Sequence, residues 1–253
     1  MNILVVLRMM PDAVGELQLM EDCRSIDREW LDFQLNDFDD HALEDAILLK
    51  ESLGARVTVL GVGEGTTRVL QMASARGADE VISLPTDPDA IVSSRAIAAT
   101  VAELALARQA DLVITGVQSP EDVFGALAPY VGALLRWPHV SGTNRIAARD
   151  GLLLVSQERG AGGSVTYEVT LPAVLGVQTA TKAPRYVSGS KLREASKTPI
   201  GRIEARADGF AAEAEIVSLR LPTGGDVEWL GGDADAVADR IAAILAESGS
   251  TRS

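Results

Sequence analysis

Residues 111–138 read DLVITGVQSPEDVFGALAPYVGALLRWP and place a short apolar strand directly before a helix. The pattern predicts the strand at residues 111–115 and the helix at residues 122–135, which Trp137 and Pro138 end. A chain that turns from a strand into a helix leaves backbone N–H groups unpaired, and such groups bind anions. In an α/β protein, this connection is where a nucleotide phosphate would lie.

The sequence before this stretch repeats the same alternation of strand and helix. Apolar runs typical of buried parallel strands occur at residues 3–7, 56–60 and 80–84. Helical patterns follow them at residues 40–53, 66–76 and 93–108. Such repeated units predict an α/β fold with a doubly wound, mostly parallel sheet. The loops after three of the strands should then converge on one nucleotide, and these are residues 6–13, 61–65 and 116–127.

The pattern changes after Pro138. Glycine-rich turns separate three strand-like runs, which predict an antiparallel extension of the sheet at residues 140–148, 151–159 and 164–171. One more apolar strand is expected at residues 172–177. These elements complete a predicted nucleotide-binding domain at residues 1–187, followed at residues 188–253 by a candidate docking loop and a C-terminal arm.

Residues 181–199 are polar and have no settled period, which predicts an exposed segment. Its basic side chains are Lys182, Arg185, Lys191, Arg193 and Lys197. On an acidic chain this segment is either a docking element or a solvated connection. Further on, residues 233–247 predict a capped helix with an apolar face, which must pack on its own domain or on another chain.

Composition excludes several classes of function. The formal charge of −13 and the pI near 4.6 argue against partners such as nucleic acid or anionic membranes. One cysteine and two histidines provide neither an internal disulfide nor a zinc site. The apolar run near the N-terminus is too short for a signal peptide or a membrane span. The chain is therefore expected to be cytoplasmic, with no membrane insertion.

Candidate site residues have structural interpretations beside the functional ones. The glycines of GVGEG at residues 61–65 lack the spacing of a dinucleotide fingerprint and are typical of a plain turn. Asn36 is expected to cap the following helix with its side chain or to hold an adenine or ribose edge. The nearby carboxylates suit the helix dipole better than a metal, so no metal is predicted; they are Asp32, Asp37, Asp39, Asp40, Glu44 and Asp45. No nucleophile, base and orienting group form a catalytic set, so the chain is not expected to be an enzyme.

Several segments together resemble the beta subunit of electron transfer flavoproteins, the heterodimeric carriers that take electrons from dehydrogenases. The resemblance runs over nearly the whole chain, and the spacing from Gly116 to Trp137 is its most specific part. Its segments are VVLRMMPD at 5–12, LNDFDDHALEDAILLKE at 35–51, LGVGE at 60–64, GADEVI at 77–82, DLVITGVQSPED at 111–122, WP at 137–138, GG at 162–163, LPAV at 171–174, PRY at 184–186 and PI at 199–200.

The resemblance implies an adenine nucleotide alpha hydrolase-like fold in a non-catalytic subunit. Such a subunit binds AMP, while a partner alpha subunit makes most contacts to FAD and a flavin dehydrogenase supplies the electrons. The implied cofactor-binding residues are Val6, Asn36, Asp37, Phe38, Asp39, Val62, Gly63, Gly116, Val117, Gln118, Ser119, Asp122, Gly125, Ala126 and Leu127. The implied partner-docking residues are Tyr186, Gly189, Leu192 and Arg193. The C-terminal segment would embrace the alpha subunit.

The chain departs from the family pattern in the phosphate loop. Relatives usually read QxG or QTG where this chain has Ala126, Leu127 and Ala128, so only backbone N–H groups remain there for a phosphate. Two alternatives stay open beside the AMP-binding carrier. One is an electron-bifurcating form in which a second FAD replaces AMP, and the other is a flavin-free regulatory protein that binds a nucleotide.

Further departures affect the partner and the flavin. The family's anchoring leucine falls on Gly189, and Leu192 is the nearest apolar replacement, which implies a donor other than a typical acyl-CoA dehydrogenase. An aromatic position near the flavin falls on Ala13. A glutamate implicated in domain closure falls on Arg159, with Glu158 beside it.

Overall fold

The computed structural model describes residues 1–12, 17–27, 31–86, 93–149, 151–160, 162–204, 216–221, 227 and 229–248. The chain forms two compact units, Met1–Leu219 and Arg220–Ser253, whereas the sequence places the domain boundary at residues 187 and 188. The first unit contains the sheet with its helices, and the described part of the second contains one helix. Ala13 lies outside the described residues.

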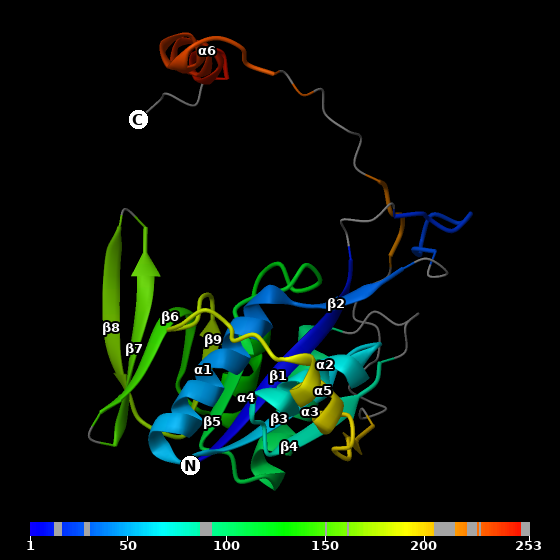
Figure 1. The fold of residues 1–253 in the computed structure, drawn as a ribbon, viewed down its shortest axis with the longest axis vertical. Helices are drawn as coiled ribbons and strands as arrows, with labels where there is room; N and C mark the ends of the chain where they lie inside the picture. The colour runs from blue at the N-terminus through cyan, green and yellow to red at the C-terminus, as the bar shows by residue number, and fades with distance from the viewer. Residues whose placement is uncertain are drawn as a thin grey trace. The chain divides into compact units, whose positions relative to one another are not determined.

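A parallel sheet forms the centre of the first unit (Figure 1). Its strands are β1 (Asn2–Pro11), β3 (Arg56–Val62), β4 (Glu80–Leu84), β5 (Leu112–Gly116) and β9 (Ala173–Val177). They lie in the order β4-β3-β1-β5-β9, so the strand order reverses between β1 and β5. Ligands of such sheets bind at this switch point, at the carboxyl ends of the strands.

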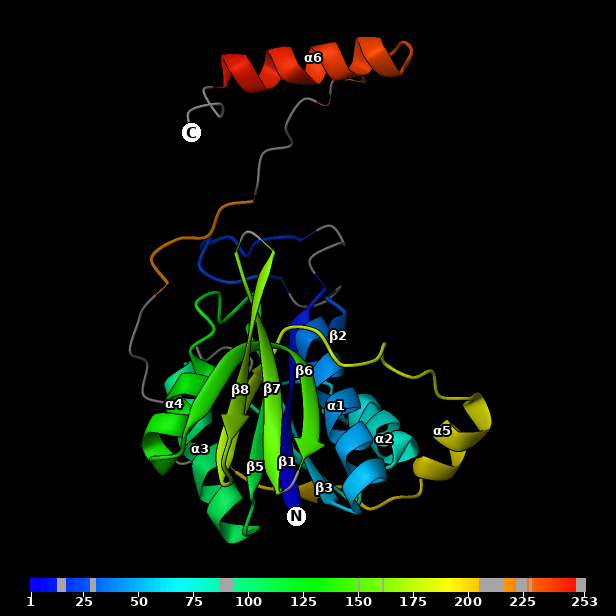
Figure 2. The ribbon, with the colours of Figure 1, turned by 90° about the vertical axis from the view of Figure 1, so that its left-hand side faces the viewer.

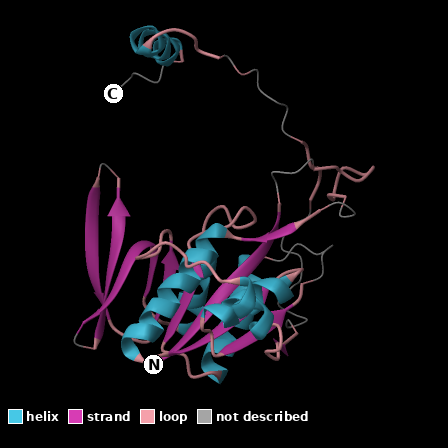
Figure 3. Cartoon of the chain, in the orientation of Figure 1, coloured by secondary structure: helices cyan, strands magenta, loops and turns pink. Residues whose placement is uncertain are grey.

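Helices cover both faces of the sheet, which confirms the predicted fold class (Figures 2 and 3). The first face is packed by α1 (Asp37–Leu53) and α2 (Thr66–Arg76). The second face is packed by α3 (Ser94–Ala107) and α4 (Leu127–Leu135). Because the parallel strands are buried from both sides, they consist of continuous apolar runs rather than alternating ones.

The antiparallel extension is also present. It consists of β6 (His139–Arg149), β7 (Leu152–Arg159) and β8 (Gly163–Val169). The start of β6 pairs parallel with β9, and the rest of β6 pairs antiparallel with β7. The change falls at an irregularity around Gly142, whose φ of 71° suits a residue without a side chain. Apolar side chains of the extension then pack into the core on the α1 face.

Three short elements escape the sequence patterns. Strands β2 (Phe33–Leu35) and β10 (Gly201–Arg202) pair with β1 and β4, and both are too short to show a period. Helix α5 (Gly189–Ala195) lies inside the segment that was expected to be irregular and packs against α2. Its seven residues make a helical period hard to detect.

Helix α4 begins at Leu127 rather than at residue 122 as expected. The residues before it form a turn in which Gly125 has a φ of 63° and its N–H donates to the carbonyl of Asp122.

In the second unit, α6 (Ala234–Glu247) has its predicted cap, because the Asp233 side chain accepts a hydrogen bond from the N–H of Ala236. No described helix is long and apolar enough to cross a membrane.

Asp45 is a buried acid where α1 meets the antiparallel extension. One carboxylate oxygen, Oδ1, accepts a hydrogen bond of 2.9 Å from the N–H of Thr181, while Oδ2 is buried without a partner. Burial raises the pKa of Asp45 from 3.8 to about 6, the hydrogen bonds from Thr181 oppose this rise, and the charge of Glu44 adds to it. Ionised Asp45 therefore costs stability at neutral pH.

We predict that Asp45→Asn removes one component of the pH dependence of unfolding. The native state holds this proton more tightly than the unfolded chain, so the contribution of Asp45 to wild-type stability falls as pH rises from about 4 to about 6. A pKa rise of this size corresponds to a loss on the order of 3 kcal/mol. Urea unfolding of both proteins from pH 4 to pH 7.5 measures it as the difference between the two curves. Parallel curves would contradict the prediction.

Candidate functional site

A buried arginine occupies the base of the switch point between β1 and β5. Arg8 lies near the end of β1, and only 5% of its surface is exposed. Its guanidinium faces Asp39 in the first turn of α1, with Nε donating to Oδ2 at 2.9 Å and Nη2 donating to Oδ1 at 2.9 Å. The backbone N–H of Arg8 donates to the same Oδ2 at 2.8 Å. This two-pronged pair fixes α1 against the end of β1.

The same guanidinium holds the loop that follows β5. Nη2 also donates to the carbonyl oxygens of Gly116 at 3.2 Å and Gln118 at 3.0 Å, and Nη1 faces Asp122 Oδ2 at 3.4 Å. Burial alone would lower the pKa of Arg8, but the charges of Asp39 and Asp122 raise it. Arg8 therefore stays charged and joins three segments that are distant in the sequence.

Asp39 is fully buried, and its oxygens are already engaged. Besides Arg8, Oδ1 accepts a hydrogen bond of 2.7 Å from the N–H of Gly116. A side chain at Gly116 would place its Cβ only 2.4 Å from that oxygen, so this position requires glycine. The family resemblance assigns Asp39 and Gly116 to cofactor binding. In the structure, these two residues are hydrogen-bonded to each other.

Asn36 precedes α1 but does not cap it with its side chain, so that prediction was wrong. Its Nδ2 instead donates a hydrogen bond of 2.8 Å to the carbonyl of Gln118. Asn36 thus crosses the switch point beside Arg8 and supports the same loop. Only 2% of Asn36 is exposed, so this side chain lies within the loop contacts.

The start of α4 is held by an internal carboxylate. Asp122 Oδ1 accepts from the N–H of Ala126 at 2.8 Å, and Oδ2 accepts from the N–H of Leu127 at 3.1 Å. The expectation that these amides are unpaired was therefore wrong, because the loop folds back and Asp122 takes the position of an anion. The two N–H groups converge on a single carboxylate, as they would on a phosphate.

The remaining predicted cofactor residues differ in accessibility. Val6 and Val62 lie in the core, Phe38 and Val117 are half-buried, and Asp37 is exposed. Gly63 and Gly125 adopt positive φ angles, and Ser119 accepts a hydrogen bond of 3.1 Å from the N–H of Asp122. The residues that the structure brings together are Asn36, Asp39, Gly116, Gln118, Asp122, Ala126 and Leu127, with Arg8 among them. We call this group the cradle.

Sequence analysis missed Arg8 as a site residue. The available signal was a cation at the end of an otherwise apolar strand, followed by acidic residues at the start of the next helix. Buried arginine is rare unless it is paired, so such a position predicts a carboxylate partner. Among the described residues, no group of histidine, cysteine and acidic side chains is placed to hold a metal.

A second ion-pair cluster forms around Arg185, in the basic segment at residues 181–199. Arg185 donates from its backbone N–H to Glu44 Oε2 at 3.0 Å and from Nε to Glu44 Oε1 at 2.9 Å, and its guanidinium also pairs with Glu51. Both partners lie on α1, so Arg185 fastens the segment to that helix. The hydrogen bonds that Arg185 donates to Glu51 and Glu44 raise the pKa of its guanidinium.

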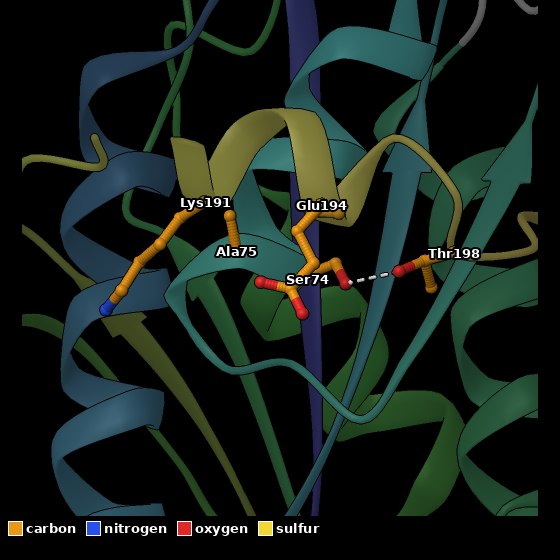
Figure 4. A pocket seen from close by; sticks show the side chains of 6 residues that line it. Ser74, Ala75, Lys191, Glu194 and Thr198 are labelled. Atoms are coloured by element: carbon orange, nitrogen blue, oxygen red, sulfur yellow. Dashed lines mark hydrogen bonds between the residues drawn. The ribbon is translucent and has the colours of Figure 1, made fainter. Parts of the chain in front are cut away.

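Helix α5 then rests on α2 around a cavity of about 260 Å³ (Figure 4). The lining residues are Ser74, Ala75, Lys191, Glu194, Ala195 and Thr198. A hydrogen bond of 3.1 Å between the hydroxyls of Ser74 and Thr198 closes one side of it. In Figure 4 the Lys191 side chain extends away from Glu194. Three of the predicted docking residues, Gly189, Leu192 and Arg193, therefore lie on a short helix supported by α2, whereas Tyr186 lies before it.

We predict that Arg8→Ala destabilises the first unit by about 3–5 kcal/mol, because it leaves Asp39 buried without its countercharge. Denaturant unfolding measures this loss. Hydrogen exchange at the amide of Gly116 should become faster as well, since its acceptor loses the group that positions it. The control is Arg145→Ala on β6, whose exposed side chain should change stability by no more than about 0.5 kcal/mol. Equal losses for both variants would contradict the role given to Arg8.

Comparisons with known proteins agree with this architecture. A family model, the electron transfer flavoprotein domain, matches residues 25–208. The electron transfer flavoprotein subunit beta of Methylophilus methylotrophus is 27% identical over 264 residues and covers 98% of both chains. The subunit of the same name from Syntrophomonas wolfei is 28% identical over 87% of this chain and 85% of its own length. That of Mycobacterium tuberculosis H37Rv is 29% identical over 79% of this chain and 77% of its own length. The chain therefore belongs to the electron transfer flavoprotein family, as a beta subunit with a role in electron transfer.

Proposed function

We propose that this chain pairs with an alpha subunit and helps to hold FAD, which accepts electrons from a flavin dehydrogenase and passes them to a downstream acceptor. The observation that carries the proposal is the cradle at the switch point, where loops after β1 and β5 meet the start of α1. The chain supplies no catalytic side chain in this proposal. Its own task is to bind and position.

The cradle is the proposed site of AMP. The N–H groups of Ala126 and Leu127 converge on one anion, which is the geometry that a phosphate needs. Asp122 holds that position, so a phosphate there has to displace this carboxylate or lie beside it. The exposed Gln118 side chain is a polar group offered to the nucleoside.

The second unit supplies a surface for another chain. Helix α6 buries none of its residues. Its large apolar side chains, Ile241, Ile244 and Leu245, are close to half exposed. Trp229, shortly before this helix, is 92% exposed. An amphipathic helix without packing partners is marginal on its own, so we assign its apolar side to the alpha subunit.

The nucleotide content of the co-expressed heterodimer tests the proposal. We expect one FAD and one AMP per heterodimer in the extract of acid-denatured complex, quantified by chromatography. Two FAD without AMP would replace the AMP assignment with the electron-bifurcating form. A complex without flavin, or a beta chain that binds nucleotide but no alpha subunit, would favour the regulatory protein and refute the carrier.

The position of the family's anchoring leucine offers a test of the donor. Gly189 is exposed, and a Cβ added there meets nothing within 4 Å. We therefore propose that the missing leucine excludes a typical acyl-CoA dehydrogenase as the donor.

We predict that Gly189→Leu lets the heterodimer accept electrons from a medium-chain acyl-CoA dehydrogenase about tenfold faster than wild type, because a leucine in a pocket adds about 1.5–3 kcal/mol. Flavin reduction at limiting dehydrogenase is the measurement. Gly189→Ser has the same backbone change without the apolar side chain and should behave as wild type. Rapid reduction of the wild-type complex would contradict the proposed exclusion.

A further inference from the structure

We propose that Asp122 is a specificity-determining residue of the cradle, because its carboxylate competes with the phosphate of a nucleotide for one position. The inference rests on the proposed nucleotide site and specifies what that site selects. A phosphate that enters has to break the contacts of Asp122 before it makes its own, so the nucleotide gains little from its phosphate. The cradle should therefore discriminate only weakly between AMP and adenosine.

Three hydrogen-bond donors converge on the Asp122 carboxylate. The N–H of Ala126 donates to Oδ1 at 2.8 Å, and the N–H of Leu127 donates to Oδ2 at 3.1 Å. Nη1 of Arg8 faces the same Oδ2 at 3.4 Å. Only 8% of Asp122 and 5% of Arg8 are exposed, so these contacts are largely shielded from water. Two amides and a buried guanidinium thus form an anion site that the chain fills with its own carboxylate.

A phosphate would fit these donors better than the carboxylate does. Asp122 offers two oxygens to three donors, so Oδ2 is shared, and its distance to Nη1 of Arg8 exceeds that of a good hydrogen bond. The terminal phosphate of AMP has three acceptor oxygens, one for each donor. A phosphate can therefore replace the carboxylate on the same set of donors.

Charge disfavours the alternative in which phosphate and carboxylate lie side by side. The single positive charge of Arg8 is already paired with Asp39 through two hydrogen bonds from its guanidinium. Asp122 adds a second carboxylate to the same guanidinium. A phosphate beside both carboxylates would place further negative charge in a poorly solvated site without a cation to balance it. The phosphate therefore binds where Asp122 leaves.

The loop around Asp122 permits this release. The neighbouring side chains of Glu121, Val123 and Phe124 are exposed, with Phe124 at 98%, so their packing does not oppose it. The backbone turn is held separately, by hydrogen bonds between the main-chain groups of Asp122 and Ser119. The carboxylate can thus leave by rotation of its side chain to another rotamer while the turn persists.

Calorimetric titration of the full-length chain with AMP and with adenosine tests the inference, since adenosine lacks only the phosphate. We expect wild type to bind AMP less than about threefold more tightly than adenosine, because the gain from one charged contact is largely cancelled. Asp122→Ala should raise the affinity for AMP about tenfold or more and leave that for adenosine within about twofold. Asp122→Asn removes the charge in a side chain of the same shape and should raise the affinity for AMP by about threefold or more.

Glu121→Ala is the matched control. It removes the same charge from the adjacent position, whose side chain is exposed, whereas the amides of Ala126 and Leu127 donate to Asp122. Its affinity for AMP should stay within about twofold of wild type. Adenosine reports on folding, because a disordered cradle would lose both ligands. If Asp122→Ala no longer binds adenosine, Asp122→Asn decides the question.

The outcomes distinguish this inference from the proposed function. If adenosine stays bound and neither Asp122 variant gains affinity for AMP, the competition is refuted while the nucleotide site stands. A wild type that prefers AMP tenfold or more, or equal gains for Glu121→Ala and Asp122→Ala, would also refute it. A wild type that binds neither AMP nor adenosine, alone and in the heterodimer, would contradict the proposed AMP site and this inference together.

Discussion

The ion pair between Arg8 and Asp39 is the contact on which the geometry of the candidate site depends. The guanidinium of Arg8 donates hydrogen bonds to Asp39 and to the carbonyl oxygens of Gly116 and Gln118. Removing a buried charge from its partner costs several kcal/mol, so none of these groups can move alone. A strand end, a helix start and a loop are therefore held in one arrangement, and Asp122 extends this arrangement to the first turn of α4.

Much of the fold follows from the sequence because buried parallel strands and their helices have strong periods. Strand β4 and helix α2 begin and end where the patterns place them, at residues 80–84 and 66–76. Local patterns do not reveal contacts between distant residues. The Arg8–Asp39 pair spans 31 residues and the Asn36–Gln118 contact spans 82, so their hydrogen bonds appear only in the folded chain. Helix α4 begins after the predicted residue for the same reason. The Asp122 side chain accepts a hydrogen bond from the loop before α4, and Asp122 does not itself belong to the helix.

Residues of the cradle fall into two groups, those engaged inside it and those at its surface. Asp39 and Gly116 are engaged with each other, and their residue types are explained without a ligand. Gln118, whose side chain is exposed, and Ala126, which is half-buried, lie at the surface of the loop. A family motif therefore includes residues that the construction of the loop alone explains. Sequence similarity alone does not separate the two kinds of residue.

Helix α1 contacts both the cradle and the segment that contains Arg185. Its first turn carries Asp39 in the cradle, and its last turns carry Glu51, which holds Arg185 and thereby the segment of Tyr186. Along a straight helix, Asp39 and Glu51 are separated by roughly 18 Å. The helix therefore fixes the spacing between the cradle and the segment that Arg185 fastens to it. Inserting one residue in the middle of α1 would rotate Glu51 by about 100° and turn the docking segment to another side.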